Sequence, residues 1–140
     1  MAISARNKLQ GRVSSIKSGE AMCLVTLDAQ GTKIVAAVTN QGVEELKLKQ
    51  NDQVTAVIKS TEVMLMKGGD KAMFSARNRF AGQVESVQKG EAMGLVTVKM
   101  GKFHLGAAIT CEAIDEMGLK QGDQVTAVVK ATEVMVIKEA

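Results

Sequence analysis

The sequence VTAVIKSTEVM occupies residues 54–64 and returns as VTAVVKATEVM at residues 125–135. The same spacing relates SARN at residues 4–7 to SARN at residues 75–78, and it continues without a gap to Lys67 and Lys138. Roughly half of the aligned positions are identical, which is the signature of an internal repeat. We therefore predict two sister domains, residues 1–68 and 73–140, that dock closely because their linker (69–72) is short.

Each repeat contains five short runs rich in β-branched and other apolar residues, separated by clusters of Gly, Asn, Asp and Lys. In the first repeat these runs are residues 13–16, 24–27, 34–38, 54–58 and 63–66. Residues 40–48 break the pattern with the spacing of one short amphipathic helix. The predicted fold is all-β with one short helix per repeat, in the form of tandem OB-like five-stranded barrels, which leave few exposed sheet edges.

The ends of the predicted helices carry typical capping residues. Thr39 and Thr110 precede the two helices and are placed to cap them. Gly118 follows the second helix at the expected left-handed position, where the first repeat carries Lys47 at some conformational cost. Just before the fourth strand, the second repeat has Gly122 where the first has Asn51. Both residue types tolerate positive φ, so a tight turn is expected there.

The last strand of each repeat is apolar at consecutive positions, in residues 63–66 and 134–137. A half-exposed strand would alternate, so this pattern predicts that both faces are covered. A 70-residue barrel has little interior, and the second face is therefore expected to pack on the sister domain or on another subunit. A strand buried wholly within its own chain explains the same pattern.

The composition argues against several classes of partner. The net charge of +3 is spread over interleaved Lys and Glu, which is typical of a solvated mixed surface. Single-stranded nucleic acids are bound by stacking on aromatic platforms, yet the chain has no Trp, no Tyr and three Phe. It shows no N-terminal signal pattern and no apolar run near the roughly 20 residues of a membrane span. We expect a cytoplasmic protein that binds neither nucleic acid nor membrane.

The repeated residues do not predict catalysis. The one histidine, His104, aligns with Lys33, and no Ser or Cys nucleophile comes with a paired base in both repeats. Cys23 aligns with Gly94 and Cys111 with Asn40, so the cysteines form neither a disulfide framework nor a metal motif, and they are expected to be small buried side chains. The acidic residues shared by the repeats occur singly, without metal-ligand spacing. The chain is therefore predicted not to be an enzyme and not to bind a metal ion directly.

The polar residues kept in both repeats are mostly hydrogen-bond donors. Ser4, Arg6, Asn7, Thr39 and Lys59 can all present N–H, O–H or ammonium groups. A site built mostly from donors favours an oxyanion. Taken singly, each residue also has a structural interpretation as a cap, a turn residue or a surface charge.

These motifs resemble the molbindin family. The resemblance rests on SARN at residues 4–7 followed by Gly11, on the turn at Gly19, on the helix entry at Thr39, and on VTAVIKSTEVM, and it spans almost the whole chain twice. It implies an OB-like barrel in the two-domain form of that family, which binds molybdate or the similar tungstate as an oxyanion at sites shared between subunits. It also implies a trimer of two-domain chains.

The resemblance also implies the ligand-binding residues. They carry over as Ser4, Arg6, Thr39, Lys59 and Ser60 in the first repeat, and as Ser75, Arg77, Thr110, Lys130 and Ala131 in the second. Two departures affect this set. The family often has a serine where this chain has Gly42 and Ala113, and it commonly reads Gly-Ala-Val-Asn where this chain has Gly-Glu-Ala-Met at residues 19–22 and 90–93.

The leading hypothesis from sequence is a protein that binds molybdate or tungstate for intracellular storage and homeostasis. Two alternatives stay open. One is a tandem OB-fold nucleic-acid-binding protein, which the scarcity of aromatic residues disfavours. The other is a regulatory interaction module acting in trans, although the sequence contains no helix-turn-helix or nucleotide-binding loop.

Overall fold

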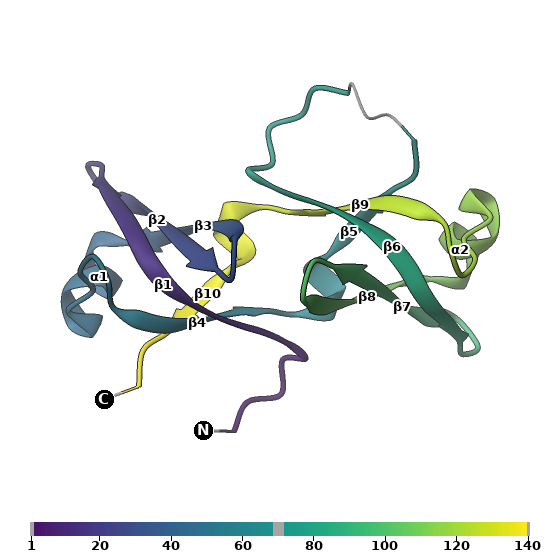
Figure 1. The fold of residues 1–140 in the computed structure, drawn as a ribbon, viewed down its shortest axis with the longest axis horizontal. Helices are drawn as coiled ribbons and strands as arrows, with labels where there is room; N and C mark the ends of the chain where they lie inside the picture. The colour runs from purple at the N-terminus through teal and green to yellow at the C-terminus, as the bar shows by residue number, and fades with distance from the viewer. Residues whose placement is uncertain (1, 69–71, 140) are drawn as a thin grey trace. The chain divides into compact units, whose positions relative to one another are not determined.

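The structure, a computed structural model, describes residues 2–68 and 72–139 (Figure 1). The first repeat contains strands β1 (Asn7–Ser18), β2 (Met22–Ala29), β3 (Thr32–Thr39), β4 (Gln53–Ile58) and β5 (Met64–Met66), with helix α1 (Asn40–Leu46) and the single-turn 3₁₀ helix η1 (Ser60–Glu62). The second contains β6 (Asn78–Lys89), β7 (Met93–Met100), β8 (Phe103–Thr110), β9 (Gln124–Val129) and β10 (Met135–Ile137), with α2 (Cys111–Met117) and η2 (Ala131–Glu133). Of the predicted linker, residues 69–71 lie outside the described part of the chain.

The strands form two antiparallel five-stranded sheets, in the orders β10-β4-β1-β2-β3 and β5-β9-β6-β7-β8. Within each sheet the two edge strands approach each other, since β10 also lies near β3 and β5 near β8. Each sheet is thereby curled into a half-barrel with one short α-helix. The predicted mostly-β fold with one helix per repeat is confirmed.

The first strand of each repeat is longer than the sequence indicated. β1 begins at Asn7 rather than near Val13, because Asn7 and Leu9 point inward while Lys8 and Gln10 face solvent. Its first half pairs with β4 and its second half with β2, and the register shifts at a bulge between Val13 and Ser15. Such a bulge bends a strand, so one strand can belong to both sides of the curled sheet.

Gly11 lies where this bent strand crosses β2. A Cβ at Gly11 would lie 2.8 Å from the Asp28 carbonyl oxygen, and one at Gly82 would lie 2.6 Å from a Val98 methyl and 2.7 Å from the Lys99 carbonyl oxygen. Only glycine allows the backbones to approach this closely.

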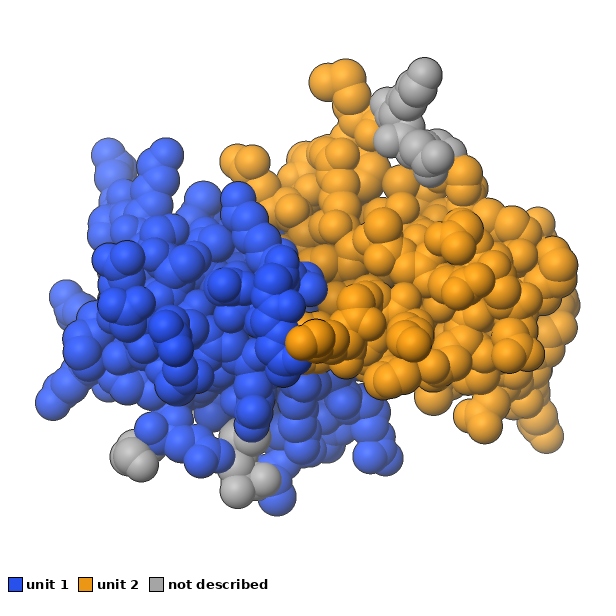
Figure 2. All heavy atoms as spheres, in the orientation of Figure 1, with its two compact units in different colours: residues 1–58, 130–140 blue, residues 59–129 orange. Residues whose placement is uncertain are grey.

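The compact units of the structure are not the sequence repeats. One unit comprises residues 1–58 and 130–140, and the other residues 59–129 (Figure 2). The chain passes from unit 1 to unit 2 after Ile58 and returns after Val129, so each repeat gives its last strand to the other unit. β10 pairs with β4, and β5 pairs with β9. The domain boundaries 1–68 and 73–140 remain a prediction from the sequence repeat. Which residues pack together in the structure follows from the strand exchange.

The core of unit 2 includes Val84, Val96, Val98 and Ile114. Leu65 of the exchanged strand β5 packs against this cluster. Burial of apolar surface contributes a free energy of about 25 cal/mol per Å², so these contacts stabilise the exchanged three-residue strand in unit 2.

The two helices attach to their sheets by different residues. Ile114 of α2 is 1% exposed, whereas α1, with Val43 at that position, has no buried residue. A Cβ at Gly94 would lie 2.4 Å from the Ile114 side chain, so glycine on the strand leaves room for isoleucine on the helix. In the first repeat the larger Cys23 accompanies the smaller Val43. Cys23 is buried, as expected for both cysteines, but Cys111 is only half-buried.

The predicted helix ends are confirmed. The hydroxyl oxygen of Thr39 accepts a hydrogen bond from Gly42 N at 3.0 Å, and that of Thr110 accepts one from Ala113 N at 3.0 Å. Lys47 and Gly118 are both left-handed, with φ of 51° and 59°. The expected turn before the fourth strand has φ of 76° at Asn51 and 93° at Gly122.

Candidate functional site

The boundaries of the two compact units divide the ten predicted site residues of the repeats between them. Unit 1 contains Ser4, Arg6, Thr39, Lys130 and Ala131, and unit 2 contains Lys59, Ser60, Ser75, Arg77 and Thr110. η2, which begins at Ala131, lies near β3, which ends at Thr39. η1, which begins at Ser60, lies near β8, which ends at Thr110. The strand exchange therefore places the lysine of one repeat in the same unit as the threonine of the other.

The capping hydrogen bonds of the two threonines do not use their hydroxyl hydrogens. As a cap, each hydroxyl oxygen accepts a backbone N–H, which uses one of its lone pairs. The O–H hydrogen is not used by this bond and can be donated outward. Both threonine residues are exposed.

The serine and arginine of each SARN run lie just before the long first strand. Arg6 and Arg77 are exposed, while the asparagines that follow them, Asn7 and Asn78, are buried at 4% and 2% exposure. Asn7 pairs with Ile58 at the end of the β1·β4 ladder, and Asn78 pairs with Val129 in the same way. A buried residue directly after each arginine fixes the point at which the arginine leaves the sheet.

The two lysines lie just beyond these same ladders. Lys59 follows Ile58 and Lys130 follows Val129, and each forms the extended residue before a 3₁₀ turn. Neither lysine side chain caps its turn. Both are exposed, so their ammonium groups are accessible to an anion.

Each unit contains one lysine–aspartate ion pair at the end of its exchanged strand. The sequence did not single out these four residues as a set. Lys138 Nζ lies 3.0 Å from Asp52 Oδ2 and donates to the Lys47 carbonyl oxygen at 3.0 Å. In unit 2, Lys67 Nζ lies 3.1 Å from Asp123 Oδ2 and donates to the carbonyl oxygens of Met117 and Gly118 at 3.1 and 3.3 Å. Lys67 and Lys138 are the last equivalent residues of the two repeats, and this equivalence is the sequence signal that marks the lysines of the pairs. Their partners belong to the opposite repeat and were therefore missed.

The aspartates of these pairs have lowered pKa values. The hydrogen bond from Lys138, followed by those from the Lys49 side chain and backbone, lowers the pKa of Asp52 from 3.8 to about 2. For Asp123 the hydrogen bond from Lys67 is the largest cause, followed by the Lys120 backbone N–H, and the pKa is again about 2. Both aspartates are ionised near neutral pH and complete these ion pairs.

Two charged pairs among the described residues occur in the second repeat without an equivalent in the first. Lys89 forms a hydrogen bond with Asp115 that raises the lysine pKa, and His104 Nδ1 lies 3.0 Å from Glu85 Oε1. The first repeat has Ser18 and Glu44 in place of the lysine pair. Exposed pairs of this kind stabilise proteins little, and none belongs to a repeated site.

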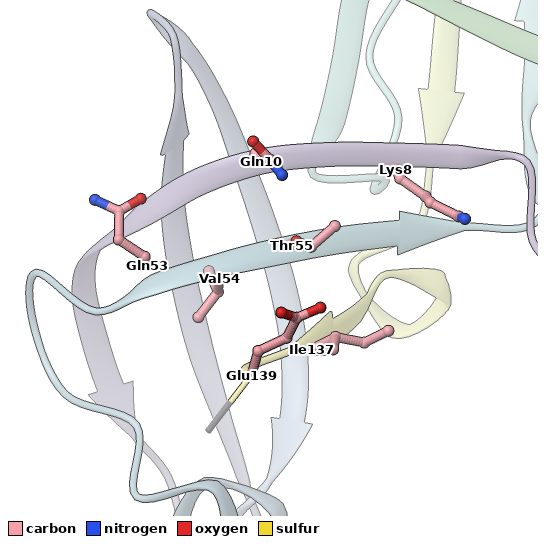
Figure 3. A pocket seen from close by; sticks show the side chains of 7 residues that line it. All are labelled: Lys8, Gln10, Gln53, Val54, Thr55, Ile137 and Glu139. Carbon is pink, nitrogen blue, oxygen red and sulfur yellow. The ribbon is translucent and has the colours of Figure 1, made fainter. Parts of the chain in front are cut away.

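An open hollow on unit 1 is lined by Lys8, Gln10, Gln53, Val54, Thr55, Ile137 and Glu139 (Figure 3). It lies over β1, β4 and the end of β10, and it includes none of the ten predicted site residues. At the equivalent positions of unit 2, Gln10 and Glu139 are replaced by Ala81 and Gly68. The hollow is therefore not a feature that the two units share.

Residues 2–68 and 72–139 contain neither a cluster of metal-binding side chains nor a membrane-spanning helix. No group of three or more His, Cys, Asp or Glu residues in these ranges is arranged to hold a metal ion. No helix in the same ranges is long and apolar enough to cross a membrane.

The family profile described as the TOBE domain matches residues 3–65 and 75–136, one match per repeat. The chain is 38% identical over 138 residues to the molybdenum transport protein ModE of Herbaspirillum seropedicae, covering 97% of this chain and 51% of that protein. It thus spans about half the length of that relative. It is also 46% identical over 67 residues to molybdenum-pterin-binding protein 1 of Clostridium pasteurianum, covering 47% of this chain and 98% of that protein.

A solved structure of the cytoplasmic molybdate-binding protein ModG, with molybdate bound, superimposes with a TM-score of 0.95. The two chains are 34% identical, and the match covers 99% of this chain and 100% of that one. The similarity therefore includes both units and the exchange of strands between them.

Proposed function

This chain belongs to the TOBE domain family, and we propose on that basis that it is a non-enzymatic cytoplasmic protein that binds molybdate, or the similar tungstate, as an oxyanion. The observation that carries the proposal is the match of the complete two-unit fold to the molybdate-bound ModG structure. The donor-rich residues repeated in both units give the match a chemical basis.

The proposed donor sets are adequate for the ligand. Micromolar binding corresponds to about 8 kcal/mol. A hydrogen bond to a charged group contributes about 1.5–3 kcal/mol, so about three to six donors suffice. Unit 1 supplies Ser4, Arg6, Thr39 and Lys130 side chains, to which the Ala131 backbone N–H can be added. Unit 2 supplies the corresponding groups and also the Ser60 hydroxyl.

We propose that the sites are completed between subunits in a homo-oligomer, a trimer of two-domain chains. Met64 and Met135 support this assembly, because these equivalent residues of β5 and β10 are 49% and 52% exposed. Large apolar side chains repeated on a surface favour burial against a further chain. The ModG structure is described with a cooperative binding mechanism, which also favours more than one coupled site.

The physiological role that fits these properties is storage and homeostasis of the oxyanion. Nucleic-acid binding is disfavoured further by the positions of the phenylalanines. Phe80 is buried, Phe103 is half-buried, and the Phe74 ring is covered by the Arg79 guanidinium at 4.0 Å. Phe80 and one face of Phe74 are therefore not available for stacking with a base.

Thermal melting with molybdate, tungstate and sulfate tests the proposal. Free ligand at about 100 times its dissociation constant should stabilise the folded protein by roughly 2.7 kcal/mol per independent site. Sulfate is a smaller tetrahedral ion and should raise the melting temperature less. Native mass spectrometry of the same samples should show a trimer with bound oxyanions. Equal melting temperatures in all three anions at millimolar concentration would reject the oxyanion function.

A further inference from the structure

Each threonine of the proposed oxyanion sites has a methionine as its neighbour on the adjacent strand. In the β2·β3 ladder Met22 lies directly opposite Thr39, and in the β7·β8 ladder Met93 lies directly opposite Thr110. Directly opposed residues of an antiparallel pair point to the same face of the sheet. The methionine and threonine side chains of each unit therefore share one face.

The backbone hydrogen bonds place these two side chains close together. The Asn40 N–H donates to the Ala21 carbonyl oxygen at 2.9 Å, and the Cys111 N–H donates to the Ala92 carbonyl oxygen at 2.8 Å. These bonds join the residues next to each methionine–threonine pair, so the pair itself is of the non-hydrogen-bonded kind. In such pairs the Cα atoms are only about 4.5 Å apart. A methionine side chain can therefore reach an anion that is held by the threonine hydroxyl opposite it.

The two methionines are fixed by their backbones and keep exposed side chains. The Gly19 N–H donates to the Met22 carbonyl oxygen at 2.9 Å, and the Gly90 N–H donates to the Met93 carbonyl oxygen at 2.8 Å. Each methionine thus begins a strand that is bonded to a neighbour on either side. The residues are nevertheless 40% and 45% exposed, so these apolar side chains do not fill a core and are available to a ligand.

An apolar side chain beside a bound anion discriminates between anions by their hydration. Removal of a charge from water costs free energy, and the cost is larger for a smaller ion because its charge is more concentrated. Sulfate is smaller than molybdate and carries the same charge, so it loses more hydration energy when an apolar group displaces the surrounding water. Hydrogen bonds from the protein to the anion are also stronger where water is excluded. Such a contact therefore favours the larger oxyanion.

We propose that Met22 and Met93 are selectivity residues of the oxyanion sites: each covers the anion held by the threonine opposite it, excludes water, and thereby favours molybdate and tungstate over sulfate. The proposal rests on the oxyanion function proposed above. Both repeats keep the methionine, whereas the residue that follows it is Cys23 in one and Gly94 in the other. The methionines add no hydrogen bond to the ligand, so they act on the choice between anions more than on the affinity for molybdate.

The test compares the double variant Met22→Ala, Met93→Ala with Met22→Leu, Met93→Leu. Calorimetry at constant ionic strength gives the molybdate affinity, and competition with molybdate gives the sulfate affinity. Alanine removes the apolar cover, so the ratio of molybdate to sulfate affinity should fall about tenfold, the lower end of the discrimination that one apolar contact gives. Leucine has nearly the volume of methionine and should keep the wild-type ratio. The ratio of molybdate to tungstate affinity should stay constant throughout, because these two ions are nearly equal in size.

Leu95→Ala is the matched control for Met93→Ala. Leu95 lies two residues further along β7 on the same face and is 36% exposed, but it is opposite Ala108 instead of a threonine. Its removal takes apolar surface from the same face and should leave the molybdate-to-sulfate ratio unchanged. Because both anions compete for the same sites, a loss of folding or assembly lowers both affinities alike. The ratio therefore does not respond to a purely structural role of the methionines.

Selection by size alone makes the opposite prediction, because alanine enlarges the site and a larger site fits the smaller sulfate less well. If the wild-type protein binds molybdate and the alanine variant keeps or raises the ratio, the selectivity role is wrong while the oxyanion function stands. The role is equally wrong if the leucine variant, or Leu95→Ala, lowers the ratio as much as the loss of methionine does. If the wild-type protein binds neither molybdate nor tungstate, the oxyanion function fails and the selectivity role fails with it.

Discussion

Lys47 and Gly118 occupy equivalent left-handed positions at the ends of α1 and α2. The conformational free energy of this backbone geometry differs between lysine and glycine. A residue with a Cβ in this conformation costs about 1–2 kcal/mol relative to the right-handed region, whereas glycine adopts it freely but loses more entropy on folding. We predict that Lys47→Gly raises the free energy of unfolding by about 0.5–1 kcal/mol. The Lys47 carbonyl that accepts the Lys138 hydrogen bond is retained. Urea unfolding measures the change, and Gly118→Lys should shift stability in the opposite direction. Equal stabilities of wild type and Lys47→Gly would show that the left-handed lysine is not strained.

Ser60 and Ala131 are the one pair of proposed site residues that differ between repeats in hydrogen-bonding capacity. Because of the strand exchange, the serine belongs to unit 2 and the alanine to unit 1. A hydrogen bond to a charged ligand contributes about 1.5–3 kcal/mol, so Ala131→Ser should tighten the weaker class of sites by about tenfold or more, and Ser60→Ala should weaken the tighter class. Calorimetric titration with molybdate should show two classes of site in the wild type and a single class in the Ser60→Ala variant. Unaltered isotherms in both variants would mean that the residue after each lysine binds through its backbone N–H alone.

At the scale of elements, most strands and both helices were predictable because their patterns are local. The capping threonines, the left-handed residues and the positive-φ turn at Asn51 all depend on sequence neighbours, and all were confirmed. The start of β1 was missed because Asn7 is a polar residue on the inward face, and a polar residue there hides the alternation. Leu9 alone was too short a signal for a strand.

The strand exchange could not be predicted from sequence, for a specific reason. β10 pairs with Thr55, Ala56 and Val57, while β5 pairs with the identical run at residues 126–128. Either closing strand therefore fits either sheet equally well, and pairing preferences cannot distinguish an exchanged strand from one that closes its own repeat. As a result, Lys59 and Ser60 of the first repeat belong to unit 2, and Lys130 and Ala131 of the second belong to unit 1.

The ends of the exchanged strands should respond to acid. Asp52 and Asp123 have folded-state pKa values lowered from 3.8 to about 2, chiefly by hydrogen bonds from Lys138 and Lys67. A lowered carboxyl pKa stabilises the fold above the unfolded-state value, and this contribution is lost as the pH falls from 3.8 through about 2. We predict that unfolding free energies measured in urea fall over this range, and that the fall is smaller in the double variant Asp52→Asn, Asp123→Asn. Parallel curves for the variant and the wild type would show that these aspartates do not contribute to acid sensitivity.

At the scale of the whole molecule, neither repeat contains a complete sheet. Residues 2–68 include β5 but not its partner β9, and residues 72–139 include β10 but not its partner β4. Units of about 70 residues bury only about 60% of their unfolded surface and are marginally stable alone. The exchange ties the stability of each unit to the presence of the other repeat, which a pair of independent barrels would not do.

Separate expression of residues 2–68 and 72–139 tests this dependence. When mixed, the two fragments should form a complex in equal amounts, because each supplies the closing strand of the other. Each fragment alone should associate in even-numbered assemblies through the same exchange, since the receiving runs at residues 55–57 and 126–128 are identical. In the intact chain the linked repeats meet at high effective concentration, so exchange within one chain is favoured. Fragment stability should accordingly depend on concentration, while closure of the intact chain should not. Native mass spectrometry gives the stoichiometry, and hydrogen exchange at residues 64–66 and 135–137 reports whether the closing strands are paired. Fragments that remain monomeric both alone and mixed, with those amides fully protected, would show that each repeat can close its own sheet and that the exchange is not required for folding.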